Sequence, residues 1–181
     1  MQIQSKTHRI IRNLVFAAVC LALCMVLPFL TGQIPQIGSM LCPMHIPVLL
    51  AGFLCGPWWA LAVGAVAPTL RYLLFSMPPL LPTGLAMTFE LLTYGLAAGL
   101  LYRLLPKKPG YIYVALICAM LVGRIVWGVA SILVYGAVGK SFTWPIFFAG
   151  AFGNAIPGMI VHIVLIPVLV LALKKAKIIN D

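Results

Sequence analysis

Long apolar runs, separated by short connections rich in proline and glycine, dominate the chain. A helix that spans a membrane needs roughly 20 mostly apolar residues, and fewer where neighbouring protein shields its ends. The pattern predicts six membrane-spanning helices, at Ile11–Leu30, Leu41–Cys55, Trp58–Phe75, Gly84–Leu105, Ile112–Ala137 and Trp144–Leu173. We therefore expect an all-α integral membrane protein in which residues 1–181 form one transmembrane domain.

The connections between these runs carry turn residues. The segment "TGQIPQIGSM" joins the first two predicted helices as a long loop, and "CGPW" makes a tight turn before the third. The segment "GKSFTWP" leads into the sixth, with Pro145 near its first position, where the missing N–H of proline costs least.

Composition strengthens the membrane assignment. Hydrophobic residues make up 64% of the chain, charged residues 8%, and the mean hydropathy is +1.14. A soluble domain is about half apolar and about a quarter charged. No separate soluble domain for catalysis or nucleotide binding is expected. The five cysteines form no C-x-x-C pair, so no metal site is predicted either.

The formal net charge of +10 is explained by its distribution along the chain. Most basic residues form three short clusters between apolar runs: Lys6, Arg9, Arg12, Arg103, Lys107, Lys108, Lys174, Lys175 and Lys177. Cytoplasmic loops of membrane proteins carry such an excess of Lys and Arg. This rule predicts both termini in the cytoplasm and Lys140 in an outer loop. Nucleic acid is not an expected partner, since it would favour a continuous basic stripe.

Polar side chains fall in the outer half of the predicted bundle. They are Arg71, Glu90, Arg124, Asn154 and His45, with Gln36 in the loop above them. An ionisable side chain at membrane depth costs at least about 2.5–3.5 kcal/mol, so these groups must face a cavity or one another. One interpretation is a ligand cavity open to the outside. The other is an ion pair of Glu90 with either Arg71 or Arg124 that only holds helices together.

Both interpretations leave a surplus of positive charge, because two arginines face one glutamate. That surplus suits an anionic ligand, such as a carboxylate. Trp127 follows Arg124 by three residues and therefore shares its helix face. We expect Trp127 and Tyr94 to line the cavity. His162 is placed toward the cytoplasmic third, where a structural hydrogen-bonded role is expected.

Small residues form a further pattern. Ala18 and Ala22 lie four residues apart on the first predicted helix, and "G-x-x-x-G" spacing occurs at Gly52 with Gly56 and at Gly95 with Gly99. Small residues at this spacing let helices approach closely in a membrane. The glycine pairs are expected in internal packing, and the alanine pair on a face toward a partner.

Taken together, these features resemble the substrate-binding S components of energy-coupling factor (ECF) vitamin transporters. The resemblance covers essentially the whole chain. It rests on the six helices, the alanine pair, the long outer loop and the run "HIPVLLAGFLCGPWWALAVGAVAPTLRYL". The segments "FELLTYGLAAGLLYRLLP" and "GNAIPGMIVHIVLIPVLV" are similar to the fourth and sixth helices of the pantothenate- and folate-type members.

The resemblance implies a multi-pass protein of a prokaryotic plasma membrane that binds a vitamin tightly from outside. It further implies assembly with a transmembrane coupling subunit, through Ala18 and Ala22, and with two ATPase subunits that use the ATP. No cofactor is then expected in this chain. A small carboxylated vitamin is favoured, pantothenate before folate, and a pyridoxine-type compound or cobalamin is the alternative.

Two other classes of function stay open on the sequence. An intramembrane enzyme would need an acid–base pair such as Glu90 and His162, but the chain has no H-E-x-x-H motif and no nucleophile elbow. An autonomous channel or secondary carrier is the other class. The lack of evident related halves argues against a common carrier fold.

Overall fold

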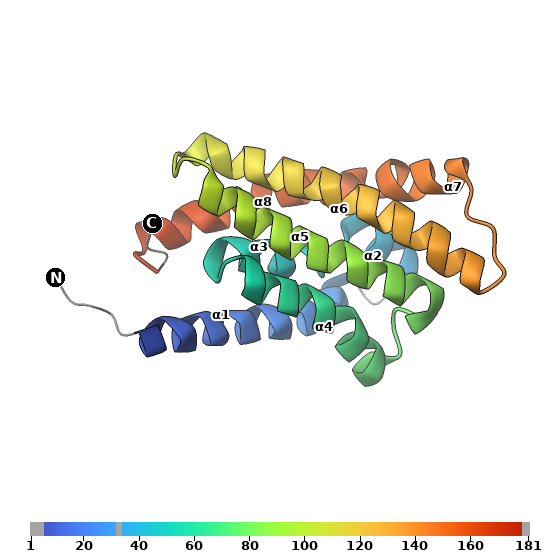
Figure 1. Ribbon diagram of the computed structural model, residues 1–181, viewed down its shortest axis with the longest axis horizontal. Helices are drawn as coiled ribbons and strands as arrows, with labels where there is room; N and C mark the ends of the chain where they lie inside the picture. The colour runs from blue at the N-terminus through green and yellow to red at the C-terminus, as the bar shows by residue number, and fades with distance from the viewer. Residues whose placement is uncertain (1–5, 32–33, 179–181) are drawn as a thin grey trace.

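The computed structural model describes residues 6–31 and 34–178, and within them it is entirely helical (Figure 1). The chain order is α1 (Lys6–Val26), η1 (Leu27–Thr31), α2 (Pro35–Leu41), α3 (His45–Leu54), α4 (Pro57–Phe75), η2 (Leu80–Gly84), α5 (Leu85–Leu104), α6 (Pro109–Ala137), α7 (Trp144–Phe148), η3 (Ala149–Gly153) and α8 (Ile156–Lys175). In the described part, five stretches are long and apolar enough to cross a membrane, and α3 is a shorter apolar helix of 10 residues.

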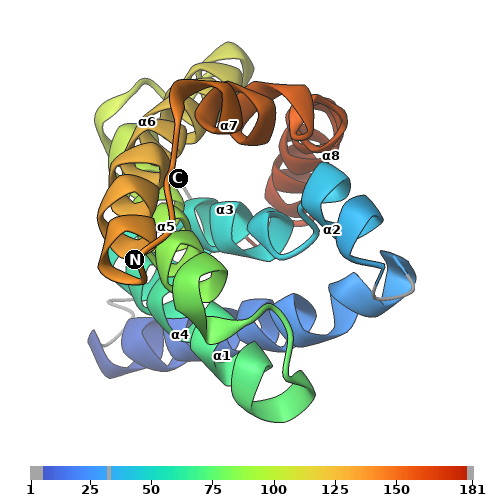
Figure 2. The ribbon, with the colours of Figure 1, turned by 90° about the vertical axis from the view of Figure 1, so that its right-hand side faces the viewer.

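The short helix α3 lies at the centre of the bundle. Viewed from one end, the long helices surround it (Figure 2). All of its residues except Ile46 and Leu54 are buried. A helix that is apolar on every side is stable only when protein covers all of it, which explains why ten residues suffice here. The short length predicted for the second span is thus confirmed.

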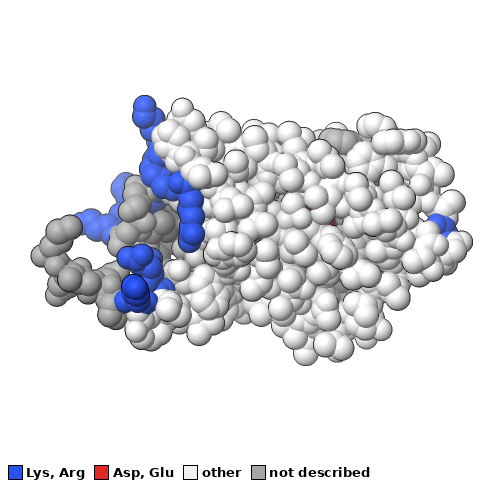
Figure 3. All heavy atoms as spheres, viewed as in Figure 1, with Lys and Arg blue, Asp and Glu red and all other residues white. Residues whose placement is uncertain are grey.

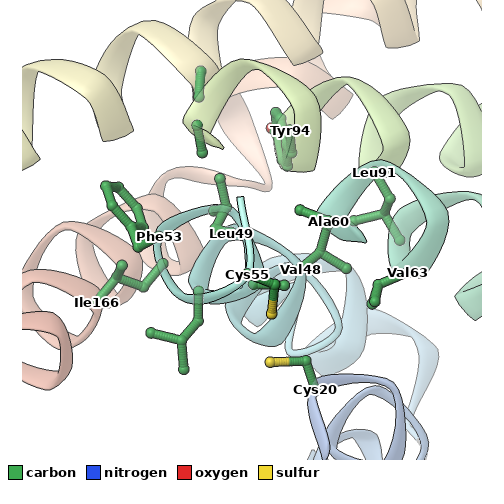
Figure 4. Close-up of a cluster of buried hydrophobic side chains, with 14 of the residues drawn as sticks. Cys20, Val48, Leu49, Phe53, Cys55, Ala60, Val63, Leu91, Tyr94 and Ile166 are labelled. Carbon is green, nitrogen blue, oxygen red and sulfur yellow. The ribbon is translucent and has the colours of Figure 1, made fainter. Parts of the chain in front are cut away.

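The core forms where the side chains of α3 meet those of the surrounding helices (Figure 4). Val48, Leu49 and Phe53 of α3 are almost fully buried there. Cys20 of α1, Ala60 and Val63 of α4, Leu91 and Tyr94 of α5, and Ile166 of α8 complete the cluster. Many apolar side chains of the outer helices are exposed instead, among them Leu73 at 73% and Leu133 at 68%. Such a surface suits lipid rather than water.

Glycines set the close approach of α5 to its neighbours. A Cβ atom on Gly52 of α3 would lie 2.9 Å from the backbone nitrogen of Gly99, and one on Gly99 would lie 2.6 Å from Cα of Pro57. A Cβ on Gly95 would collide with the carbonyl group of Ala60. The prediction of internal packing is confirmed for these three glycines. Gly56 differs, because it precedes α4 with a φ of 87°, which glycine adopts without strain.

Two boundaries predicted from the sequence are wrong. The predicted second span began at Leu41, but the structure has a separate helix α2 in the expected loop, and α3 begins only at His45. Cys42 separates the two helices with a left-handed φ of 47°. The predicted sixth span is also interrupted, since a π-helical turn, η3, lies between α7 and α8. Glycines at 150 and 153 and Pro157 weaken continuous helix there.

Basic residues gather at one end of the molecule. Figure 3 shows Lys and Arg over the end where α1 begins and α8 ends, which is also the end of the turn between α5 and α6 (Figure 1). The connection between α6 and α7, which contains Lys140, lies at the opposite end. The first described helix therefore starts at the same end of the molecule at which the last one finishes, as an even number of membrane-spanning helices requires.

Candidate functional site

A buried ionic cluster joins three helices near the centre of the bundle. Glu90 of α5 lies 3.0 Å from Nη1 of Arg124 on α6 and 3.4 Å from Nε2 of His45 on α3, each measured to Oε1 of Glu90. The side chains of these three residues are at most 7% exposed. The structure therefore brings together three of the predicted site residues, one from each of three helices.

Tyr94 supports this cluster from one turn further along α5. Its side chain is hydrogen-bonded to Glu90, and its ring meets that of His45 edge-on at 5.3 Å. Gly123 of α6 makes room for the ring, because a Cβ atom there would overlap it. The prediction that Tyr94 lies at the polar site is consistent with this position.

His162 belongs to the same cluster, although its sequence position predicted a place apart from the other polar residues. Its ring stacks on that of His45 at 6.1 Å with 16° between the planes, and it is hydrogen-bonded to the backbone of Cys42. The sequence pattern placed His162 in the cytoplasmic third, away from His45. In the structure α3 begins only at His45, after the separate helix α2, and the rings of His45 and His162 lie together.

Cys42 links the cluster to the end of α2. Nη2 of Arg124 donates a hydrogen bond to Sγ of Cys42 at 3.7 Å. His162 holds the backbone of the same residue. No motif in the sequence identifies Cys42 as a residue of this cluster. Its left-handed conformation at the end of a short helix is a structural feature that sequence patterns did not reveal.

Trp127 contacts both the ionic cluster and a set of aromatic side chains. The guanidinium carbon of Arg124 lies 6.0 Å from the Trp127 ring, so the predicted shared face on α6 is confirmed. Trp127 is partly buried and contacts Phe142 at 5.7 Å and Phe147 at 6.2 Å between ring centroids. A Cβ atom on Gly150 of η3 would lie 2.6 Å from the Trp127 ring, so glycine is needed for this approach.

Arg71 does not meet Glu90, which corrects one of the two pairings considered from the sequence. Its Nη1 donates to the carbonyl oxygen of Met25 at 2.7 Å, near the end of α1. Its guanidinium carbon lies 5.4 Å from the ring of Phe29 and 5.1 Å from that of Phe75. The carbonyls in the last turn of a helix lack partners within the helix, so Arg71 satisfies one of them.

Two other predicted site residues lie outside the buried cluster. The side chain of Asn154, at the end of η3, is exposed, and so is that of Gln36 on α2. Several polar atoms inside the cluster are buried without a hydrogen-bond partner among the described residues: His45 Nδ1, Arg124 Nε and His162 Nε2. Unpaired buried groups cost about 1–3 kcal/mol each, and a ligand at this site would pair them.

Comparison with known families decides the class of protein. The family model of the ECF transporter substrate-specific component matches residues 12–176. The chain belongs to this family. The searches of curated proteins and of solved structures returned no match.

As an S component, the protein is a substrate-binding subunit of an importer and not an enzyme. S components act with an ECF module composed of a transmembrane coupling subunit and ATPase subunits. The protein is therefore a multi-pass membrane protein of a transport system. The described residues contain no group of three or more His, Cys, Asp or Glu side chains arranged for a metal ion.

The face of α1 that is predicted to contact the coupling subunit is exposed in the structure. Ala18 and Ala22 of α1 are both exposed. Their neighbours Val15, Val19 and Leu23 are exposed as well. The opposite side of α1, with Ala17, Cys20 and Cys24, packs into the core. The helix thus has one side that holds it in the bundle and another that a partner or lipid can cover.

Proposed function

We propose that this S component binds a small carboxylated vitamin, with pantothenate as the first candidate and folate as the second. The observation that carries the proposal is the buried cluster of Glu90, Arg124, His45 and His162. It contains one carboxylate, one guanidinium and two imidazoles. The guanidinium of Arg124 and the ring nitrogens of the two imidazoles can donate to the carboxylate of such a ligand.

The unpaired polar atoms support the same ligand chemistry. Arg124 Nε and two ring nitrogens are potential donors, while Glu90 can accept. Pantothenate carries a carboxylate, an amide and hydroxyl groups, so it can pair with both kinds of group. A guanidinium is the preferred partner of a carboxylate because its planar donors match the two oxygens.

A pyridoxine-type compound is the second candidate, and the aromatic group near Arg124 favours it. Trp127 lies beside the cluster and stacks on Phe147 with 25° between the planes. Stacking on such rings suits a planar heterocycle. The Glu90–His45 pair would then bind the ring nitrogen and hydroxyl of the compound.

We further propose that the basic end of the molecule faces the cytoplasm and that the vitamin enters from the other end. The basis is the concentration of Lys and Arg at the end where α1 begins and α8 ends (Figure 3). Cytoplasmic segments carry this excess in membrane proteins. The end with α2 and α7 would then face outward.

The test is calorimetric titration of the purified protein with pantothenate, folate, pyridoxine and cobalamin. We expect one of the first two to bind at micromolar affinity or tighter, and Arg124→Ala to weaken that binding at least about 30-fold, as for loss of a buried charged contact. Trp127→Leu should affect pyridoxine more than pantothenate. Lys140→Ala, at the opposite end from the basic clusters, is the control and should bind normally.

Binding of pyridoxine alone would select the second candidate. Binding of none of the four compounds, by a protein that shows a normal thermal transition, would contradict the carboxylated-vitamin proposal.

A further inference from the structure

The turn between α3 and α4 points toward the basic end of the molecule (Figure 1). Its two residues are Cys55 and Gly56. Nδ2 of Asn13 on α1 donates to the carbonyl oxygen of Cys55 at 3.2 Å, which ties α1 to the turn. Three helices therefore meet at this point, and none of these residues belongs to the Glu90 cluster of the proposed vitamin site.

Two arginines from different helices lie at this turn. The guanidinium of Arg103, in the last turn of α5, lies directly against Gly56, because a Cβ atom on this glycine would collide with Nη2. Glycine therefore leaves the space that this guanidinium occupies. Arg12 of α1 precedes Asn13, and its charge acts electrostatically on Cys55. Both arginines reach the surface, since Arg103 is exposed and Arg12 is partly exposed.

No acidic side chain neutralises these two arginines in the part of the chain that the structure describes. Glu90 is the one acidic residue there, and it pairs with Arg124 and His45 instead. Nε of Arg12 is buried although the side chain is partly exposed, so its stem is held in the protein. Two guanidinium groups at one turn repel each other, and an anion that contacts both would relieve this repulsion.

The exposed side of α1 leads from Arg12 to the pair Ala18 and Ala22. Val15 lies three residues after Arg12, so the two share a side of the helix, and Val15 is 53% exposed. Ala18 follows Val15 by three residues, and both alanines are exposed as well. The arginine pair, Arg12 and Arg103, is therefore continuous with the side of α1 that is predicted to contact the coupling subunit.

From this arrangement we infer that the arginine pair is a docking site for a carboxylate side chain of the coupling subunit. A guanidinium donates to both oxygens of a carboxylate through its planar nitrogens, and two guanidinium groups at one turn define where the acidic side chain lies. The inference rests on membership of the ECF family, which supplies the partner, and not on which vitamin binds. A lipid phosphate would be attracted equally by the exposed lysines at the same end (Figure 3).

The experiment measures the affinity of the purified full-length protein for its coupling and ATPase subunits in detergent. We expect Arg12→Gln with Arg103→Gln to weaken assembly roughly 100-fold, because each hydrogen-bonded contact to a charged group contributes about tenfold or more. Lysine at both positions should recover part of the affinity, since it keeps the charge but not the planar donors. Added salt should weaken assembly of the wild type more than that of the glutamine variant. Vitamin binding by the isolated protein should be unchanged.

The matched control is Lys6→Gln with Lys108→Gln, which removes two exposed positive charges at the same end but outside the turn, and it should assemble normally. If the double glutamine variant does not fold, Arg103→Gln alone should show about a tenfold loss, since this side chain is exposed. An equal loss in the control would indicate a general effect of net charge and would overturn the inference. So would unchanged assembly of the double glutamine variant, and loss of its stabilisation by phosphatidylglycerol would then identify a lipid site.

Discussion

At the scale of single residues, Glu90 is the carboxylate on which the ionic cluster depends. It is the partner of Arg124 and of His45, and it also accepts from Tyr94. Its burial removes the hydration that would otherwise stabilise its charge. In such a cluster each charge is tolerated because the other is present.

We therefore predict that Glu90→Gln destabilises the protein strongly. Arg124 would keep its charge but lose its counter-ion in a buried position, and breaking a buried pair in this way costs about 3–5 kcal/mol. Thermal unfolding in detergent measures the effect. The double variant Glu90→Gln with Arg124→Gln should recover much of the loss, because no unpaired charge remains. A single variant as stable as the wild type would show that the pair does not support the fold.

Arg71 and Arg124 should respond differently to substitution, although both arginines are buried. Arg71 already donates to Met25 and lies near two phenyl rings, so its role is to hold the end of α1 against α4. We predict that Arg71→Gln lowers the unfolding temperature but changes vitamin affinity less than threefold, a smaller change than a buried charge contact to ligand would give. An affinity loss equal to that of Arg124→Ala would instead place Arg71 at the ligand.

The sequence identified most residues of the cluster but not their pairing. Charged groups within apolar runs are conspicuous, and Glu90, Arg124 and His45 were found in this way. The choice between Arg71 and Arg124 depends on how each helix is rotated about its axis, and several registers satisfy the same apolar pattern. His162 and Cys42 were missed because their position depends on where α3 begins.

At the scale of elements, the crossing of α4 and α5 depends on glycine. A Cβ atom at position 95 would collide with the carbonyl of Ala60, and one at position 64 would collide with the backbone of Leu91. The two helices can therefore approach until their backbones touch. This close contact fixes the position of Glu90, which lies on α5 between Leu91 and the turn η2.

We predict that Gly95→Ala costs about 1–3 kcal/mol, the range for overpacking, and weakens vitamin binding by shifting Glu90. The control is Gly136→Ala on α6, where nothing lies within 4 Å of the added Cβ. That change should be neutral or stabilising by up to about 1 kcal/mol, because alanine favours helix over glycine. Thermal unfolding of the two variants gives the comparison, and equal melting temperatures would contradict the packing argument.

The elements themselves were predictable where a single physical signal dominated. Long apolar runs gave the five long spans and the short α3, because the membrane imposes length and composition together. The helix α2 was missed because its seven residues carry no apolar run and follow a glycine-containing loop. The break between α7 and α8 was missed because the segment stays apolar throughout, and hydropathy does not distinguish a π-helical turn from an α-helix.

At the scale of the whole molecule, the two sides of helix α1 have different surroundings. Its inner side, with Ala17, Cys20 and Cys24, anchors it to α3 and α4. Its other side carries Ala18 and Ala22, which are exposed together with larger apolar residues of the same helix. Small residues at this spacing allow another helix to approach closely in a membrane. The buried Glu90 cluster contains no residue of α1, so the cluster and this face of α1 can be altered separately.

We predict that Ala18→Leu with Ala22→Leu prevents assembly with the coupling subunit while vitamin binding by the isolated protein stays within about twofold. Leucine at both positions would hold a partner helix away, and no buried contact of the bundle would change because both alanines are exposed. Co-purification with the coupling and ATPase subunits measures assembly, and calorimetry measures binding. The matched control is Ala62→Leu, an exposed alanine on α4, which should leave both unchanged. Assembly that survives the double substitution would mean that the coupling subunit uses another surface.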